Sequence, residues 1–265
     1  MNKDIIKGEA SSSPVQNKKY SDSCGHNSAF SKGHRRAQTA YDYSGFRPSR
    51  INEPQFSHLK YLIFWPVYLL SFAALERLWV QPYYYPVHCF VDDIIPFCEW
   101  FLIPYVLWYA ELLLIQIYTL LFDIDEFKNF IRFLSISFLT TLIIYMIYPS
   151  CQELRPASFE RNNILTEITA LLYSIDTNTN VCPSLHVVGA LGVIFSAFRA
   201  KGLDSRLFRV LTVLFTLAVS LSTVFMKQHS FVDVVTALPL SAAVYLIVYR
   251  LQPRLRTRNA THRSQ

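Results

Sequence analysis

Two histidines and one aspartate are the residues of this sequence that are best suited to chemistry. His229 and Asp233 stand four positions apart, so on a helix their side chains would share one face. A carboxylate at that spacing can hold one imidazole nitrogen as a donor and leave the other free as a nucleophile. His186 could then protonate a departing alkoxide. Non-catalytic alternatives stay open at this point. A single histidine at a membrane interface is more often a polar residue without a catalytic role, and His229 with Asp233 could be a structural pair.

Residues that could bind phosphate accompany these side chains. Pro183 suits the first turn of a helix, and the free N–H groups of that turn, with the Ser184 hydroxyl, could hold an anion at the positive end of the helix dipole. Arg155 offers a bidentate fork for phosphate oxygens, and Lys227 offers a point charge. Arg155 taken alone could equally be an anchor at a membrane interface.

Long apolar blocks must position these groups. The chain has 265 residues, of which 52% are apolar and 17% charged, and a block of about 18 apolar residues can cross a hydrocarbon layer roughly 30 Å thick. The sequence therefore predicts an all-α, polytopic membrane protein with six transmembrane helices, at Leu59–Trp79, Phe101–Phe122, Phe130–Tyr148, Pro183–Arg199, Leu207–Met226 and Ser230–Arg250. Residues 81–99 are broken by prolines and rich in tyrosine, which is typical of a membrane interface.

The basic residues predict an orientation. If both termini are cytoplasmic, all but four of the 25 Lys and Arg residues lie on the cytoplasmic side, and the four exceptions are Arg77, Arg155, Arg161 and Lys227. The segments that carry Arg155, His186 and His229 then share the extracytoplasmic face. The net charge of +6 follows this topology, so it does not indicate a nucleic-acid partner.

The division into regions follows from composition. Residues 1–56 are polar and are expected to form a disordered cytoplasmic tail, residues 57–250 the membrane domain, and residues 251–265 a basic cytoplasmic tail. The five cysteines have no metal-binding spacing. One or two disulfides and free thiols are both compatible with the sequence.

Three motifs together resemble a known superfamily. They read Arg155-Pro156, then Pro183-Ser184-Leu185-His186, then Ser222 with His229 and Asp233 behind it. This pattern, over about residues 145–245, resembles the type 2 phosphatidic acid phosphatases and vanadium haloperoxidases. The resemblance implies a six-helix membrane core, a phosphohistidine intermediate on His229 and His186 as the leaving-group acid. It also implies that a phosphatase member needs no metal and no cofactor.

The sequence departs from that pattern at three positions. Tyr148 and Thr223 stand where the family usually has a lysine and an arginine, so two phosphate-binding cations are missing. Lys227 is the candidate replacement. Leu185 stands for the usual glycine, which a backbone N–H contact to phosphate would tolerate. These variants look similar to inositol phosphorylceramide synthases.

The resulting functional prediction is a membrane lipid phosphatase. It would hydrolyse a lipid phosphate monoester or diphosphate at the extracytoplasmic face, in the plasma membrane. A lipid phosphotransferase and a non-catalytic protein that binds lipid phosphates remain alternatives, and a vanadium peroxidase fits least.

Other polar residues give weaker indications of function. Glu111 and Gln116 lie within an apolar block, where a charge is costly, so Glu111 is expected to face the interior of the bundle, with packing favoured over a substrate role. His88, Asp92 and Asp93 have metal-compatible spacing, but solvation at the interface is the favoured interpretation.

Overall fold

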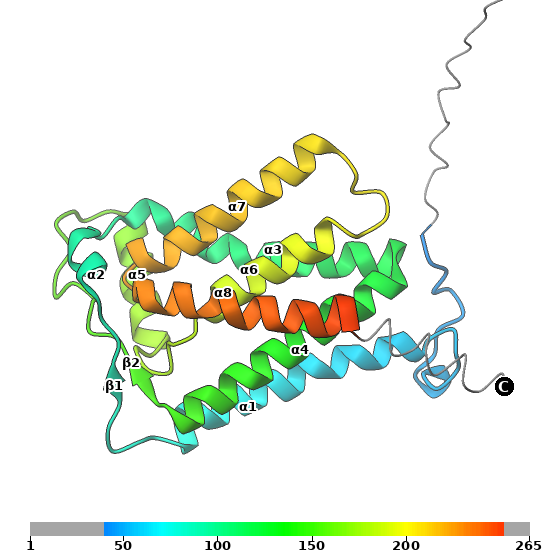
Figure 1. The fold of residues 1–265 in the computed structure, drawn as a ribbon, viewed down its shortest axis with the longest axis horizontal. Helices are drawn as coiled ribbons and strands as arrows, with labels where there is room; N and C mark the ends of the chain where they lie inside the picture. The colour runs from blue at the N-terminus through cyan, green and yellow to red at the C-terminus, as the bar shows by residue number, and fades with distance from the viewer. Residues whose placement is uncertain (1–39, 252–265) are drawn as a thin grey trace, which may run out of the picture. The chain divides into compact units, whose positions relative to one another are not determined.

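The protein is an all-α, polytopic membrane protein (Figure 1). A computed structural model describes residues 40–251, and the predicted tails at residues 1–39 and 252–265 lie outside this range. The long helices are α1 (Phe64–Leu78, preceded by a 3₁₀ helix at Ser57–Ile63), α3 (Leu102–Phe122), α4 (Ile124–Ile147), α7 (Arg206–Phe225) and α8 (Phe231–Tyr245, continued by a π-helix at Leu246–Leu251).

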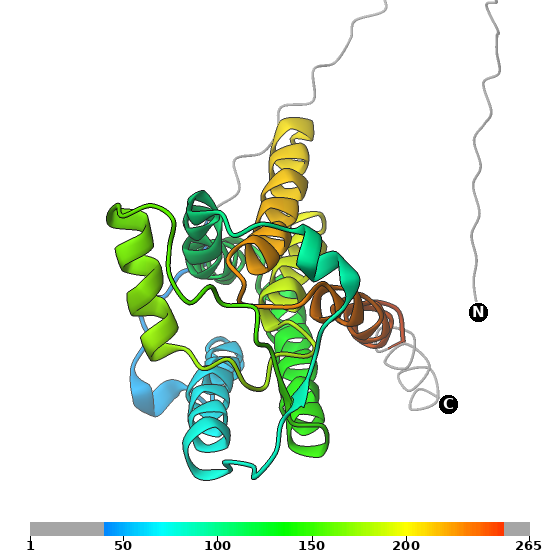
Figure 2. The same cartoon turned by 90° about the vertical axis from the view of Figure 1, so that its left-hand side faces the viewer.

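Shorter elements complete the chain between these helices. They are α2 (Phe90–Ile94), α5 (Ile164–Ile175), α6 (Leu185–Ala197), 3₁₀ helices at Pro48–Arg50 and Glu99–Phe101, and two strands, β1 (Tyr85–Pro86) and β2 (Ser150–Cys151). The strands pair in parallel, with Tyr85 opposite Ser150. We call the end of the bundle that carries α2, the strands and α5 the α5 end (Figures 1 and 2).

Within residues 40–251, five helical segments are long and apolar enough to cross a membrane. The predicted fourth span corresponds to α6, which has only 13 residues. At 1.5 Å per residue it is about 20 Å long, which is shorter than the hydrocarbon layer. The structure therefore gives five span-length helices and one shorter apolar helix where the sequence predicted six spans.

Helix α6 is the centre of the bundle. It contacts α3, α4, α7 and α8, and most of its side chains are buried. Two glycines allow this close packing. A Cβ atom at Gly189 would lie 2.7 Å from the Trp108 ring, and one at Gly192 would lie 2.8 Å from the Phe133 ring. Gly189 thus lets α6 pack closely on α3, and Gly192 lets it pack closely on α4.

Residues 40–56 pack against the bundle, so the predicted disordered tail extends too far. The Tyr41 N–H donates to the Leu121 carbonyl at 2.7 Å, and the Tyr43 hydroxyl donates to the Leu120 carbonyl at 2.8 Å. Phe56 is fully buried. These aromatic side chains supply the apolar contact that the polar residues around them lack.

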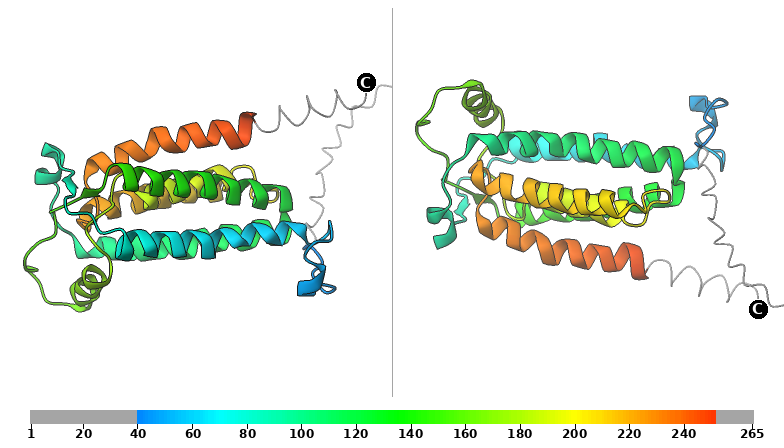
Figure 3. Two further views of the ribbon diagram at one scale, coloured as in Figure 1. Left: turned by 90° about the horizontal axis from the view of Figure 1, so that it is seen from below. Right: turned by 90° about the horizontal axis from the view of Figure 1, so that it is seen from above.

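Neither α-helix at the α5 end, α2 or α5, was predicted from the sequence, and α5 is the longer of the two. Asn163 begins α5, because its side chain accepts hydrogen bonds from the N–H groups of Leu165 and Thr166. Whereas the long helices run along the bundle, α5 lies across their direction and to one side of them (Figures 2 and 3). The loop that follows α5 leads to the start of α6.

Candidate functional site

His229 and Asp233 meet at the start of α8. The His229 Nδ1 atom lies 3.1 Å from Asp233 Oδ2, and both residues are buried. The same carboxylate oxygen accepts the Ser230 N–H at 3.0 Å, in a capping box that begins the helix. His229 precedes the N-cap residue, so the pair forms through this cap and not along one helical face. Asp233 therefore both starts α8 and orients the imidazole.

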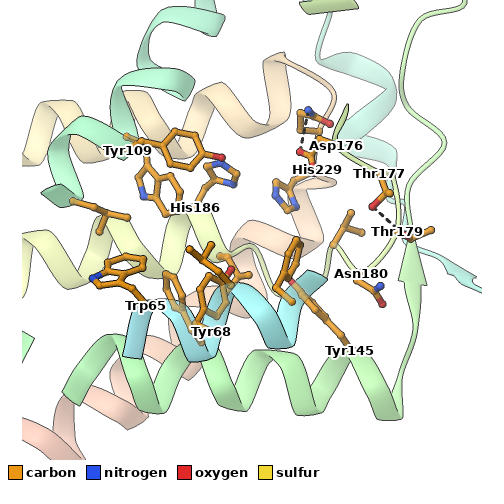
Figure 4. A pocket seen from close by; sticks show the side chains of 18 of the residues that line it. Trp65, Tyr68, Tyr109, Tyr145, Asp176, Thr177, Thr179, Asn180, His186 and His229 are labelled. Atoms are coloured by element: carbon orange, nitrogen blue, oxygen red, sulfur yellow. Dashed lines mark hydrogen bonds between the residues drawn. The ribbon is translucent and has the colours of Figure 1, made fainter. Parts of the chain in front are cut away.

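His186 lies in the first turn of α6, opposite His229. Its ring centroid is 4.3 Å from the rings of both Tyr105 and Trp108 on α3, and 5.8 Å from the ring of His229 (Figure 4). Its Nε2 atom is buried and has no hydrogen-bond partner within the described chain. The structure thus brings together the two histidines that the sequence predicted as a catalytic pair.

The N-terminus of α6 adjoins both histidines. Ser184 is the N-cap residue, and its backbone N–H donates to the Asp233 carbonyl at 3.1 Å. The Tyr145 hydroxyl donates to the Pro183 carbonyl at 2.7 Å. The Ser184 hydroxyl is buried and makes no hydrogen bond to any described residue. Since the first N–H groups of a helix have no partner within it, this turn can accept an anion beside His229.

A cavity of about 520 Å³ joins these groups to an apolar groove. Its walls are mainly aromatic and aliphatic side chains of α1 and α3, including Trp65, Tyr68, Phe72, Trp108, Leu112 and Leu113. Its end toward α5 is polar and includes Asp176, Thr177, Asn180, His186, Gln228 and His229 (Figure 4). None of the described residues that line it is a lysine or an arginine. The cavity therefore suits an amphipathic ligand.

Gln116 and Glu111 both lie in α3, but only Gln116 lines the cavity. The Gln116 side chain accepts a hydrogen bond from Trp65 Nε1 at 2.7 Å, which joins α3 to α1. The Glu111 Oε2 atom is buried, and no described residue hydrogen-bonds to it. The buried Oε2 atom agrees with the inward orientation predicted for Glu111, and the bond between Trp65 and Gln116 is a packing contact.

Arg155 is held by the backbone around α5. Its guanidinium donates to the carbonyls of Tyr173, Asp176 and Thr177 at 2.9–3.0 Å and to Gln228 Oε1 at 2.5 Å. It also lies over the Tyr173 ring, and burial lowers its pKa. Arg155 does not line the cavity. Its contacts fix the end of α5 against the residue that precedes His229.

Lys227 does not take the place predicted for it. Its Nζ donates to the Asp92 carbonyl at 2.8 Å, and the residue is absent from the cavity lining. Lys227 follows the last residues of α7 with φ 51°, a left-handed conformation that commonly ends helices. That turn directs its side chain toward α2. Among the described residues that line the cavity, no lysine or arginine therefore replaces the two missing cations at Tyr148 and Thr223.

The positions of those two departures have other contacts. Tyr148 stacks on Tyr85, with ring centroids 4.8 Å apart. The Thr223 carbonyl accepts the N–H groups of both Gln228 and His229 at 3.0 Å. Thr223 thus supports the backbone that carries His229.

Asp176 is an acidic group at the polar end of the cavity, and no motif in the sequence indicated it. Burial raises the pKa of its carboxyl, while His229 and Arg155 nearby act in the opposite direction. The loop behind it is tied to α1, because Glu76 accepts hydrogen bonds from Thr177 and from Asn180, the latter at 2.7 Å. These contacts fix the rim of the cavity.

The remaining cysteine and metal predictions concern the α5 end. Cys89, Cys98, Cys151 and Cys182 are free thiols, and Cys24 lies outside the described residues. His88 Nε2 lies 2.8 Å from Asp93 Oδ1 on the surface, whereas Asp92 faces the other way. Across residues 40–251, no three His, Cys, Asp or Glu residues gather in a way that could hold a metal ion.

Comparison with known proteins was made for the whole chain. No family model, no curated protein and no solved structure matches it. The resemblance to the phosphatidic acid phosphatase superfamily therefore stays a prediction, and the site geometry is what a functional proposal can use.

Asp92 contacts the start of α8, whereas the sequence analysis expected it to be solvated at the interface with His88 and Asp93. Its carboxylate accepts hydrogen bonds from the Ser230 hydroxyl at 2.5 Å and the Phe231 N–H at 2.7 Å. Burial raises the pKa of this carboxyl, but the hydrogen bonds from Ser230, Phe231 and Cys89 outweigh it and lower the pKa. Asp92 on α2 thus caps α8 at a distance of 138 residues from Ser230 in the sequence.

Replacing Asp92 with alanine should destabilise the start of α8. Leaving buried donors unpaired costs about 1–3 kcal/mol, so both the unfolding temperature and the turnover proposed below should fall. Because its pKa is lowered in the folded protein, Asp92 should stabilise the fold at neutral pH and lose that effect as the pH falls through the lowered value. Thermal unfolding in lipid nanodiscs at several pH values measures this.

The neighbouring residue supplies the control for this experiment. Asp93 is exposed and contacts only the surface residue His88 among the described side chains. Asp93→Ala should change the free energy of unfolding by no more than about 0.5 kcal/mol. Equal losses in the two variants would show that the cap on α8 is not what matters.

Proposed function

We propose that this chain is a membrane phosphohydrolase that acts on a lipid phosphate monoester or diphosphate. The observation that carries the proposal is the placement of His229, oriented by Asp233, at the polar end of a cavity with apolar walls. A hydrocarbon chain fits between α1 and α3, and the attached phosphate would then lie beside His229 and the N-terminus of α6.

The geometry supports a two-step reaction. With its Nδ1–H donated to Asp233, His229 keeps a lone pair on Nε2, which would attack phosphorus and form a phosphohistidine. The P–O bond to the lipid breaks at the same time, and His186 would give a proton to the departing oxygen. Water then attacks the phosphohistidine, and transfer of its proton to His186 restores both histidines and releases phosphate.

The phosphate oxygens would be bound without a lysine or an arginine from the cavity wall. The free N–H groups at Leu185 and His186, residues that line the cavity together with His229, would be the donors, and the predicted contact from the buried Ser184 hydroxyl has no support from the cavity lining. Leu185 contributes through its backbone, so its side chain does not interfere. Arg155 would not contact the phosphate. It would position the site indirectly, through the backbone carbonyls and the Gln228 side chain to which it donates hydrogen bonds.

We propose a six-span arrangement in the plasma membrane with both termini cytoplasmic and the α5 end extracytoplasmic. Support comes from the distribution of basic residues and from the tyrosines and tryptophans of the α5 end. Single cysteines at Asp204 and Glu160, labelled from outside with an impermeant reagent, test this. Reaction at residue 204 but not at residue 160 would reverse the topology.

The activity itself is tested with purified protein in nanodiscs. A panel of lipid phosphate monoesters and diphosphates should release inorganic phosphate in the presence of a metal chelator. Free phosphate and all lipid products are measured in the same reaction. A protein that binds these lipids but releases no phosphate would support the non-catalytic alternative.

A lipid phosphotransferase is the second candidate, and one observation favours it. The polar end of the cavity holds a carboxylate and neutral groups, namely Asp176, Thr177, Asn180 and Gln228, which can bind the hydroxyls of an acceptor. In that case an alcohol replaces water in the second step. A new phospholipid in place of free phosphate would distinguish the transferase from the hydrolase.

A further inference from the structure

Helix α5 has one side that packs on the protein. Leu165 and Leu172 contact a small cluster formed by Leu102, Tyr105 and Met226. Thr166 and Thr169, near the same side, are buried. This side is sufficient to hold the helix on the bundle, so its other apolar residues need a separate explanation.

Those other residues form an exposed apolar stripe. Ile164, Ile168, Leu171 and Ile175 are 67%, 43%, 59% and 68% exposed. Their spacings of four, three and four residues place them on successive turns of one helical face. Glu167 and Ser174 are exposed beside the stripe. Contiguous exposed apolar residues with a polar border are typical of a surface that contacts a partner or a membrane.

The place of α5 in the fold indicates which of these it contacts. The helix contacts the 3₁₀ helix Glu99–Phe101, directly before α3 begins. The exposed side of α3 continues with Ile103, Val106 and Leu107, on a helix long and apolar enough to span a membrane. Trp100, between the two, is 62% exposed, as expected for an aromatic residue at an interface. The stripe thus continues the surface that faces lipid.

The direction of α5 agrees with this continuity. Since the spanning helices run along the bundle and α5 lies across them, α5 runs roughly parallel to the membrane surface (Figures 2 and 3). A helix in that position, with an apolar face and a polar face, is stable at the boundary of headgroups and acyl chains.

We propose that α5 is an interfacial helix whose stripe, Ile164, Ile168, Leu171 and Ile175, is embedded in the leaflet at the α5 end of the bilayer that the protein spans. This inference does not depend on the proposed enzymatic function. It has a consequence for the cavity, because the carbonyls at the end of α5 hold Arg155, and Asp176, Thr177, Thr179 and Asn180, which follow the helix, form part of the cavity lining. Lipid contact would hold the polar end of the cavity at the level of the headgroups.

Photo-crosslinking in lipid nanodiscs tests the proposal on the full chain. Benzoylphenylalanine is introduced singly at Ile168 and Leu171 in the stripe, and at Glu167 and Ser174 on the polar border as matched controls. Mass spectrometry after illumination identifies the adducts. We expect several-fold more phospholipid adduct from positions 168 and 171 than from 167 and 174.

Two crosslinking results would overturn the proposal. One is an equal yield of lipid adducts at all four positions. The other is crosslinking of the stripe to a second copy of the chain, which would make it a protein interface. A smaller change guards against misfolding. Measured as the difference from the unsubstituted protein, whose four native tryptophans give the background, the tryptophan of Leu171→Trp should be quenched by bromine-labelled lipid chains and that of Ser174→Trp should not. Equal quenching at both positions would also overturn it.

Discussion

Replacing His229 with alanine should abolish turnover of every phosphate ester, whatever its leaving group. The reason is that the proposed nucleophile is lost, and removal of a nucleophile in comparable covalent mechanisms lowers kcat on the order of 10⁴-fold or more. The fold should survive, because Asp233 would still accept the Ser230 N–H that begins α8. Release of phosphate and of alcohol is measured for a lipid phosphate and for an aryl phosphate.

The control for this variant is another histidine of the same chain. His88 lies on the surface and contacts Asp93, so His88→Ala should keep wild-type kinetics. A pre-steady-state burst of aryl alcohol that persists in His229→Ala would remove the nucleophile from this position. Loss of activity in both variants would indicate damage that is not specific to the site.

Replacing His186 with alanine should affect lipid and aryl substrates to different extents. A lipid alkoxide is a poor leaving group and needs a proton, and loss of a general acid costs typically 10²–10⁴-fold. An aryl phosphate leaves as a stabilised phenolate, so its first step should be slowed much less. The variant should still release a first equivalent of aryl alcohol even if hydrolysis of the phosphohistidine then stalls.

The structure offers a second variant that separates charge from packing at this position. The His186 ring stacks on Tyr105 and Trp108, so alanine also leaves a gap. His186→Phe fills the gap without a proton and should show the same selective loss on lipid substrates. Equal losses on both substrates in the two variants, with no burst, would contradict the role of His186 as the leaving-group acid.

Much of the fold could be predicted because membrane helices have a strong signature in sequence. The blocks that became α1, α3, α4, α7 and α8 were located by length and apolarity. Helix α6 was located too, but the predicted span Pro183–Arg199 adds two residues at each end of the 13-residue helix, because helix ends can be placed only to within one or two residues. Helix α5 was missed because its exposed stripe spans only 12 residues. Asn163 before an apolar repeat was the available signal.

The site was predicted in part for a related reason. His186 and His229 approach each other because both stand at helix starts. The start of α8 can be inferred from its N-cap residue Ser230, whereas Pro183, predicted in the first turn of α6, precedes the N-cap residue Ser184. The directions of Arg155 and Lys227 depend on partners far away in the sequence. The carbonyls after α5 bind one, and the carbonyl of Asp92 binds the other. Spacing within a motif contains no information about such partners.

The depth of His186 in the bundle has an electrostatic consequence. The ring stacks on Trp108, six residues beyond the start of α3, which is about 9 Å inward along that helix. An interaction between a charge and a dipole is several times stronger in such surroundings than in bulk water. If the proposed function holds, the phosphate would be stabilised at this depth by neutral N–H dipoles. A site open to solvent would need lysine and arginine for the same stabilisation. The distance of this site from bulk water is thus a physical reason why Tyr148 and Thr223 are tolerated at positions where the resemblance predicts cations.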